Sequence, residues 1–188
     1  MRLFLVSAVL CAAVSTTFAQ DSISYRVVAT NKTSTMQKEM QEAGAAGFRF
    51  AGVMGGETTF GGKEVVVVMQ KPGASTSKFE YRLLATNRTS TMQKEMQDAG
   101  DAGFAYVGQT VFESLLGGKE VASIFERDAN AARQEKYEYR LLATNKTSTM
   151  QKELQEAGDA GFQMIGLTVG KTLVGGNELV SVLRRPVP

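Results

Sequence analysis

ATNKTSTMQKEMQEAGAAGF, residues 29–48, returns as ATNRTSTMQKEMQDAGDAGF at residues 85–104 and as ATNKTSTMQKELQEAGDAGF at residues 143–162. Each copy follows a short run that opens on a tyrosine: Tyr25, Tyr81 or Tyr139. Self-similarity at a period of this length is typical of an array of supersecondary units. We therefore expect the chain to fold as three copies of one small module.

Within each module the pattern predicts a strand, a helix and two further strands. The opening run, YRVVAT in the first copy and YRLLAT in the others, is rich in β-favouring residues and is followed by asparagine. Met36, Met40 and Ala43 then recur at the spacing of one helix face. A helix of about nine or ten residues is not stable alone, so this methionine face is expected to dock on the sheet. The equivalent faces are Met92, Met96, Ala99 and Met150, Leu154, Ala157.

Local signals indicate both ends of the helix. Ser34 and Gln37 have the spacing of a capping box at the helix start. Gly44 stands where a residue in the left-handed conformation would end the helix. The other copies repeat these signals with Ser90, Gln93, Gly100 and with Ser148, Gln151, Gly158.

The second and third strands of each module form a predicted hairpin. Gly47 and Phe48 open the second strand, Gly52 is a candidate bulge, and Gly61-Gly62 makes a tight turn. The turn glycines could also form an anion nest, but their place between two β-patterned runs favours the hairpin. The counterparts are Gly103, Phe104, Gly108, Gly117, Gly118 and Gly161, Phe162, Gly166, Gly175, Gly176.

The predicted fold class is α+β, with three tandem βαββ repeats. Each repeat is a mainly antiparallel three-stranded sheet with one short helix on one face. Residues 20–72, 79–128 and 137–188 form the repeats, and residues 73–78 and 129–136 are polar linkers.

The third strand predicts contact between modules. In the first copy Val65, Val67 and Met69 point to one side of the strand, and Val66 and Val68 point to the other. A sheet with one face in water would alternate apolar and polar residues, and a module of about 50 residues is marginal alone. We expect sheet faces to pack on one another, within the chain or between chains. Three modules would leave one face for a homo-oligomer partner or a ligand.

Residues 1–19 have the layout of a secretory signal peptide. Arg2 precedes an apolar run over residues 3–14, and cleavage is expected after Ala19. Cys11 is the single cysteine and lies inside that run, so the mature chain would have no disulfide. A buried N-terminal helix is the alternative, but the run shows no amphipathic period. We expect export to the periplasm or the extracellular medium, with no membrane span left after cleavage.

Composition narrows the class of partner. The chain is 43% hydrophobic and 21% charged, which is typical of globular rather than disordered proteins. Its formal charge of +2 falls by one unit when Arg2 is removed with the signal peptide. Because this near balance gives no basic footprint, we expect no nucleic-acid partner and instead a protein or another envelope component.

The residue inventory argues against an enzyme. The chain has no histidine, and no cysteine beyond Cys11, so Ser-His-Asp and Cys-His catalysis are excluded and zinc or copper lose their usual ligands. Glu39 and Glu42 lie on one helix beside Lys38, which indicates a solvated surface rather than two acids facing across a cleft. The same holds for the pairs Glu95, Asp98 and Glu153, Glu156. We expect no catalytic residue, no metal and no cofactor.

The order strand–helix–strand–strand, the opening YRVV and the helix exit EAGAAGF together resemble the small bacterial DUF4177-type domain. The resemblance covers all three repeats. Phe48, Phe104 and Phe162 stand where that family usually carries tryptophan, which this chain lacks. The resemblance implies this fold and a bacterial source, and it implies no activity, since the family is one of unknown function.

Each repeat also contains an N-glycosylation triplet, beginning at Asn31, Asn87 or Asn145. In a protein of bacterial source a turn that leads into the helix is the simpler interpretation, because asparagine is a natural turn residue.

One helix surface is a candidate partner-binding site. The first half of each repeat is nearly identical between copies, positions expected to be exposed included, whereas the second half has drifted. Recent duplication is favoured as the explanation, because a copied segment needs no function. Three identical helix surfaces that face a repeated partner would also explain it. The predicted contact residues are Gln37, Lys38, Gln41, Gln93, Lys94, Gln97, Gln151, Lys152 and Gln155.

We therefore expect an exported, non-enzymatic repeat protein that serves as a binding or structural module. Several copies of one surface would raise avidity for a partner that also repeats. The alternative is a carboxylate-dependent hydrolase or a small-ligand carrier with a pocket between repeats. A pocket with two facing acids from different repeats would favour that alternative, and a filled core between repeats would favour the module.

Overall fold

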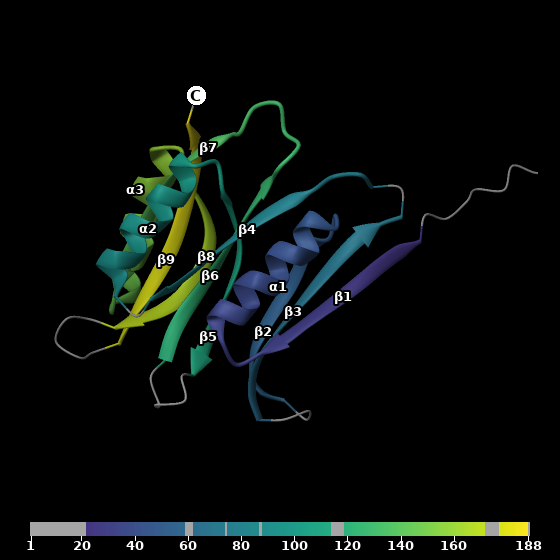
Figure 1. The fold of residues 1–188 in the computed structure, drawn as a ribbon. Helices are drawn as coiled ribbons and strands as arrows, with labels where there is room; N and C mark the ends of the chain where they lie inside the picture. Colours follow the sequence, from purple (N-terminus) through teal and green to yellow (C-terminus); the bar gives the residue numbers. More distant parts are fainter. Residues whose placement is uncertain are drawn as a thin grey trace, which may run out of the picture.

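The computed structural model describes residues 22–58, 62–73, 75–86, 88–113, 119–171 and 177–187 (Figure 1). Several features predicted from the sequence lie outside these residues: the signal peptide, Cys11, Asn87 and the turn glycines 61, 117, 118, 175 and 176.

The chain forms three βαββ repeats of the predicted α+β class (Figure 1). The first consists of β1 (Ile23–Thr30), α1 (Thr33–Ala45), β2 (Arg49–Thr58) and β3 (Gly62–Pro72). The second consists of β4 (Phe79–Thr86), α2 (Thr89–Asp101), β5 (Ala105–Glu113) and β6 (Lys119–Asp128). The third consists of β7 (Lys136–Thr144), α3 (Thr147–Asp159), β8 (Gln163–Lys171) and β9 (Asn177–Val187).

Each sheet is antiparallel and has the last strand of its repeat in the middle, in the orders β1-β3-β2, β4-β6-β5 and β7-β9-β8. The first strand of every repeat therefore lies at a sheet edge. The register of the second strand shifts beside each predicted bulge glycine: Gly52, Gly108 and Gly166. Those three bulge predictions are confirmed.

The predicted capping box at the helix start is wrong. α1 begins at Thr33, and its N-terminal cap, Lys32, makes no side-chain hydrogen bond. The amide of Gln37 does not reach back to the helix start, because it is bonded to the next repeat. The helices α2 and α3 also lack a side-chain cap, so Ser90, Gln93 and Ser148, Gln151 form no capping box either.

The predicted helix end is also wrong, by three residues. Gly44 lies inside α1, and the left-handed residue is Gly47, with φ of 91°. The Phe48 N–H donates to the Ala43 carbonyl at 3.0 Å and the Gly47 N–H donates to the Gly44 carbonyl at 2.9 Å. This pair of bonds is a Schellman ending, in which glycine supplies the positive φ. Gly103 and Gly161 end α2 and α3 in the same way.

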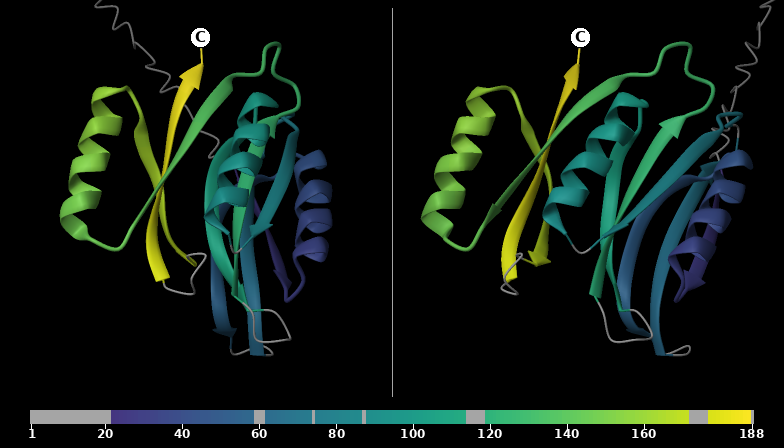
Figure 2. Two further views of the ribbon diagram at one scale, coloured as in Figure 1. Left: turned by 90° about the vertical axis from the view of Figure 1, so that its left-hand side faces the viewer. Right: turned by 60° about the vertical axis from the view of Figure 1, so that its left-hand side comes forward.

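The repeats stack so that α1 and α2 each contact their own sheet and the sheet of the next repeat (Figure 2). α1 packs on its own sheet and, more extensively, on β4 of the next repeat. We call the face of a sheet that points away from its own helix the helix-free face. The helix-free face of the second sheet covers α1, and that of the third sheet covers α2.

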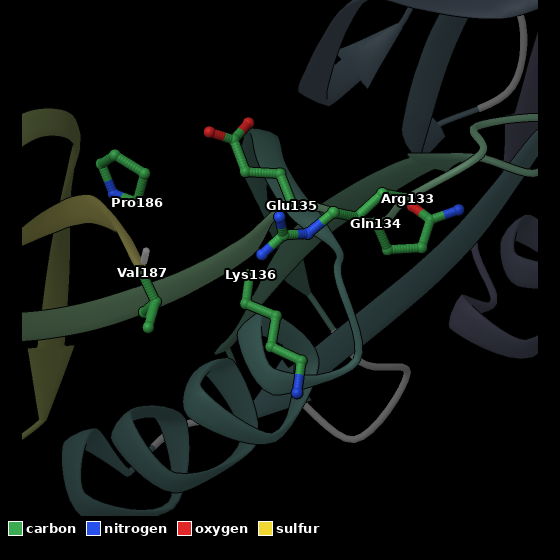
Figure 3. Close-up of a pocket in the computed structure, with 6 residues that line it drawn as sticks. All are labelled: Arg133, Gln134, Glu135, Lys136, Pro186 and Val187. Atoms are coloured by element: carbon green, nitrogen blue, oxygen red, sulfur yellow. The ribbon is translucent and has the colours of Figure 1, made fainter.

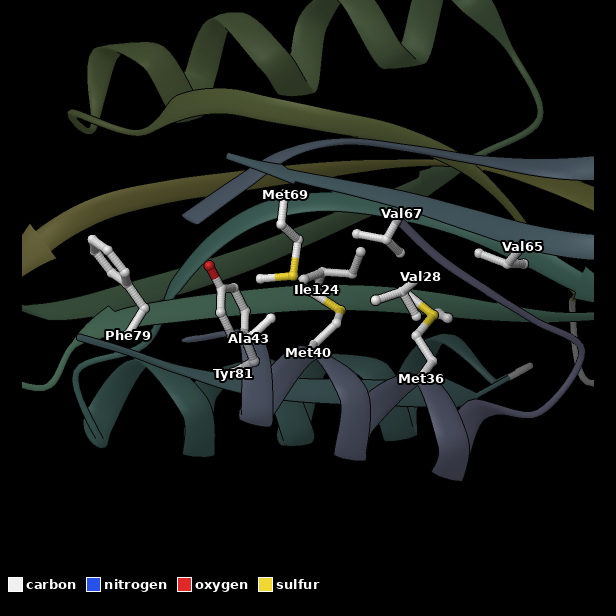
Figure 4. Close-up of a cluster of buried hydrophobic side chains, with 11 residues drawn as sticks. Val28, Met36, Met40, Ala43, Val65, Val67, Met69, Phe79, Tyr81 and Ile124 are labelled. Atoms are coloured by element: carbon white, nitrogen blue, oxygen red, sulfur yellow. The ribbon is translucent and has the colours of Figure 1, made fainter. Parts of the chain in front are cut away.

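The hydrophobic core consequently crosses the repeat boundary. The cluster in Figure 4 contains Met36, Met40 and Met69 from the first repeat together with Tyr81 and Ile124 from the second. Met36, Met40, Met69 and Ile124 are completely buried. The predicted packing of one sheet face toward another module therefore occurs within the chain, with the methionine face of the helix between them.

Neighbouring sheets also contact each other directly, the first with the second and the second with the third. An ideal Cβ added to Gly108 would lie 2.8 Å from the Phe50 ring of the preceding sheet, and one added to Gly166 would lie 2.6 Å from the Tyr106 hydroxyl. Real Cβ atoms do not come this close, so glycine at both positions allows the ring of the preceding repeat to approach the strand.

Candidate functional site

Gln37 and Gln41 of α1 bind the backbone of β4 in the next repeat. The Gln37 amide donates to the Tyr81 carbonyl at 2.7 Å and accepts from the Leu83 N–H at 2.6 Å. Gln41 accepts from the Tyr81 N–H at 2.9 Å. We call this contact between α1 and the second repeat the first junction.

The same bonds recur between α2 and β7, which we call the second junction. The Gln93 amide donates to the Tyr139 carbonyl at 2.9 Å and accepts from the Leu141 N–H at 2.8 Å. Gln97 accepts from the Tyr139 N–H at 3.0 Å and donates to the carbonyl of Tyr137 at 3.2 Å.

This pairing follows from elementary stereochemistry. β4 and β7 are edge strands, and one side of an edge strand presents N–H and C=O groups that have no strand partner. A glutamine side chain ends in an amide with donors and an acceptor, so it can bond such a strand as a peptide group would. Residues four apart on a helix lie on one face, about one turn apart. Two glutamines at this spacing can therefore bond successive groups of one strand.

A glycine on the same helix face lets the strand come close. A Cβ added to Gly44 would lie 2.2 Å from the Phe79 carbonyl oxygen, and one added to Gly100 would lie 2.3 Å from that of Tyr137. No side chain fits at either position. The glycine predicted to end each helix is thus a contact residue of the junction.

At each junction a tyrosine hydroxyl is also hydrogen-bonded to the start of the second strand of the preceding repeat. The Phe50 N–H donates to the Tyr81 hydroxyl at 2.8 Å, and the Tyr106 N–H donates to the Tyr139 hydroxyl at 2.7 Å. Burial raises the pKa of Tyr139 above its ordinary value and that of Tyr81 well above it, and the neighbouring Glu126 carboxylate adds to the effect at Tyr81. Both tyrosines therefore stay neutral donors and acceptors at physiological pH.

The polar partner beside that hydroxyl differs between the junctions. At the first, Glu126 is buried, accepts from the Tyr81 hydroxyl at 2.8 Å and pairs with Arg49 at 2.7 Å. At the second, Arg184 takes the place of Glu126 and lies over the Tyr137 ring, 4.6 Å from its centre. The glutamine, glycine and tyrosine contacts are thus shared, whereas the charged contact is not.

None of the described strands lies on the equivalent surface of α3. Gln151 and Gln155 are exposed, and in the described part of the chain the one hydrogen bond from this pair joins Gln155 to Asp159 of the same helix. A Cβ added to Gly158 would meet no atom within 4 Å. Met150 and Leu154 are half-buried, whereas their counterparts in α1 and α2 are buried. We call Gln151, Gln155 and Gly158 the open clamp.

At the other end of the array, none of the described helices bonds the outer edge of β1 as α1 bonds β4. Tyr25 and Val27 are 63% and 62% exposed, whereas Tyr81 and Tyr139, the counterparts of Tyr25, are each 3% exposed. Behind them on the helix-free face of the first sheet, Val66 and Val68 are half-buried, although their counterparts Ala122, Ile124, Val180 and Val182 are completely buried.

The residues predicted to bind a partner therefore fall into three groups. Gln37, Gln41, Gln93 and Gln97 were expected on a solvent face, but they are half-buried and bonded to the next repeat. Lys38, Lys94 and Lys152 are exposed. Gln151 and Gln155 alone combine the shared pattern with an open surface. A partner outside the chain stays a prediction for all of them.

Two pockets lie near the junctions in the described residues. One of about 480 Å³ is lined by residues 133–136 and 186–187, and Figure 3 shows the Glu135 and Lys136 side chains pointing away from each other. The other, of about 350 Å³, includes Glu126, Asp128 and Glu135. No group of three histidine, cysteine, aspartate or glutamate residues that could hold a metal occurs among the residues that the structure describes.

The acids of the second pocket already have partners. Glu126 is bonded to Tyr81, Asp128 accepts from the N–H of Asn130 at 2.8 Å, and Glu135 accepts from the Tyr137 hydroxyl at 2.7 Å. The paired acids on the helices are not among the residues that line this pocket, and Glu42, Asp98 and Glu156 are exposed to solvent.

Among the described residues, none of the helices is long and apolar enough to cross a membrane. No family model, curated protein or solved structure matches the chain. The resemblance to the DUF4177-type domain thus stays a prediction.

Proposed function

We propose that this chain is an exported, non-enzymatic structural module that binds the edge strand of a β-sheet in a protein partner through α3. The observation that carries the proposal is the open clamp. The chain uses the same glutamine pair and glycine twice to hold an edge strand, at α1 and at α2, and presents them a third time on α3 with no strand in place.

The chemistry of the two filled junctions defines the segment that the open clamp would accept. It is an extended strand with one free edge, because the glutamines bond main-chain groups. It carries a tyrosine whose hydroxyl can reach the start of β8, as Tyr81 reaches the start of β2 and Tyr139 that of β5. The side of this strand that faces α3 is apolar, so that it can cover Met150 and Leu154.

The core between repeats supports a module over a hydrolase or a carrier. Apolar side chains from both repeats fill the space between neighbouring sheets, beneath the methionine faces of α1 and α2. The acids that line the pocket of about 350 Å³ are engaged in hydrogen bonds with Tyr81, Asn130 and Tyr137.

The test uses a synthetic strand as the probe. The peptide KYEYRLLAT, residues 136–144, is titrated into the chain from Gln20 onward, which contains every described residue, with β1 inactivated by Tyr25→Asp and Val27→Lys. The side-chain amide resonances of Gln151 and Gln155 are expected to shift on binding. The same chain carrying Gly158→Ala is expected to show no shift. Equal shifts in both chains, or none in either up to millimolar peptide, would refute strand binding by α3.

A further inference from the structure

We infer that the partner strand is β1 of a second copy of this chain, so that the protein assembles head to tail. This inference rests on the proposed function of α3 and goes further by identifying the partner. Its central observation is that the described repeats present the two unmatched halves of a junction that the chain forms twice within itself.

The α3 end supplies one half of a third junction. Gln151 and Gln155 stand where Gln37 and Gln41 bond β4, and Gly158 stands where Gly44 admits the strand. The residues that would receive a tyrosine hydroxyl are present too, since Phe162 and Met164 correspond to Phe48 and Phe50 of the first junction.

The β1 end supplies the other half. Tyr25 and Val27 correspond to Tyr81 and Leu83, the residues whose backbone the glutamines of α1 bond. Gly52 corresponds to Gly108 and Gly166, which are crowded by Phe50 and Tyr106 of the preceding sheet, but a Cβ on Gly52 would meet no atom within 4 Å. The glycine positions that are crowded at the internal junctions are thus open at the two ends of the array, at Gly158 and at Gly52.

The position that is charged at the internal junctions is neutral at both ends of the array. The position held by Glu126 at the first junction and by Arg184 at the second is Gln70 in the first repeat. The residue facing it from the preceding repeat, Arg49 at the first junction, is Gln163 at the α3 end. A junction between copies would bring two neutral amides together at this point, so we expect its strength to depend little on salt.

The two halves lie at opposite ends of the array and cannot meet within one chain (Figures 1 and 2). The contact is therefore heterologous, with different surfaces on the two copies. Such contacts produce rings when the rotation between copies closes and filaments when it does not. The internal junctions are favoured by the high effective concentration that a short linker gives, whereas the junction between copies forms by concentration alone.

The experiment is sedimentation velocity over a concentration series of the chain from Gln20 onward. The wild-type sedimentation coefficient is expected to rise with concentration. Gly158→Ala is expected to remain at the monomer value, because a Cβ there would strike the incoming strand as it would at Gly44 and Gly100. Lys152→Ala is the matched control and should assemble normally, since Lys38 and Lys94 stay exposed at the internal junctions.

Mixing two variants tests the polarity of the contact. Gly158→Ala leaves β1 intact, and the double variant Tyr25→Asp, Val27→Lys leaves α3 intact. Each is expected to be monomeric alone, and an equimolar mixture is expected to form dimers and nothing larger. A wild-type chain that stays monomeric, a Gly158→Ala chain that assembles normally, or a mixture that does not associate would overturn the inference. Strand binding by α3 would still be judged separately, by the peptide titration.

Discussion

The substitutions Gln93→Ala and Gln151→Ala distinguish the effect of the junction contacts on stability from the effect of the local sequence. Both glutamines follow the same residues, TSTM, and precede the same pair, KE, in helices of equal length. Gln93 makes two hydrogen bonds to β7, at 2.9 and 2.8 Å, whereas Gln151 is exposed. Any account based on helix propensity alone predicts the same effect for both.

The structure predicts different effects. Loss of the two bonds at Gln93 costs about 1 kcal/mol each, and the higher helix propensity of alanine offsets a few tenths. We expect Gln93→Ala to lower the free energy of unfolding by about 1.5–2 kcal/mol, which is about 3–8 °C in Tm for a chain of this length. Gln151→Ala should change it by less than about 0.5 kcal/mol.

The assay is urea unfolding followed by circular dichroism. Protein is kept below the concentration at which the wild-type sedimentation coefficient begins to rise, so that only monomers unfold. The midpoint is expected to fall for Gln93→Ala at unchanged slope and to stay in place for Gln151→Ala. Equal shifts of the two midpoints would refute the reasoning, because the glutamine bonds to the next repeat would then contribute nothing.

Three further outcomes are expected. Gly100→Ala should destabilise the chain strongly in the same assay, because its Cβ would lie 2.3 Å from the Tyr137 carbonyl oxygen, while Gly158→Ala should stabilise the monomer by up to about 1 kcal/mol through helix propensity. Burial raises the pKa of Tyr137 to about 12 and that of Tyr81 further still, so the stability from these neutral hydroxyls is full below pH about 10 and is lost as pH rises through the folded-state values. A urea midpoint that does not fall above pH about 10 would contradict this. Glu126→Gln places an amide where a carboxylate accepts from Tyr81, and it should cost about 1–3 kcal/mol, measured against the unchanged wild type at pH 7.

Much of each repeat could be predicted from local pattern. The spacing of Met36, Met40 and Ala43 indicated the buried helix face, and Gly52 indicated the bulge. The apolar residues on both sides of the third strand indicated packing between modules, which occurs on the helix-free faces of the second and third sheets. These features depend on residues close together in sequence, or on the simple requirement that apolar surface be buried.

The role of the glutamines could not be predicted in the same way. A polar residue on a short helix reads as a solvent contact, and Gln37 becomes a strand-binding residue only because another repeat follows it. One signal was present: Gln37 and Gln41 are unchanged in all copies, whereas the exposed position of Glu42 is Asp98 in the second. The near-identity of the first halves now has a physical explanation beside recent duplication, because these halves carry the glutamines, the glycine and the first strand that meet at each junction.

An array in which each helix packs on the first strand of the next repeat works equally well with an odd or an even number of repeats. In a sandwich built from pairs of modules, an odd module is left over, but here every added repeat fills one clamp and opens another. A chain with two or four repeats would end in the same two surfaces as the chain with three. The number of layers could therefore change by one, through loss or gain of a whole repeat, while the chemistry of both ends stayed the same.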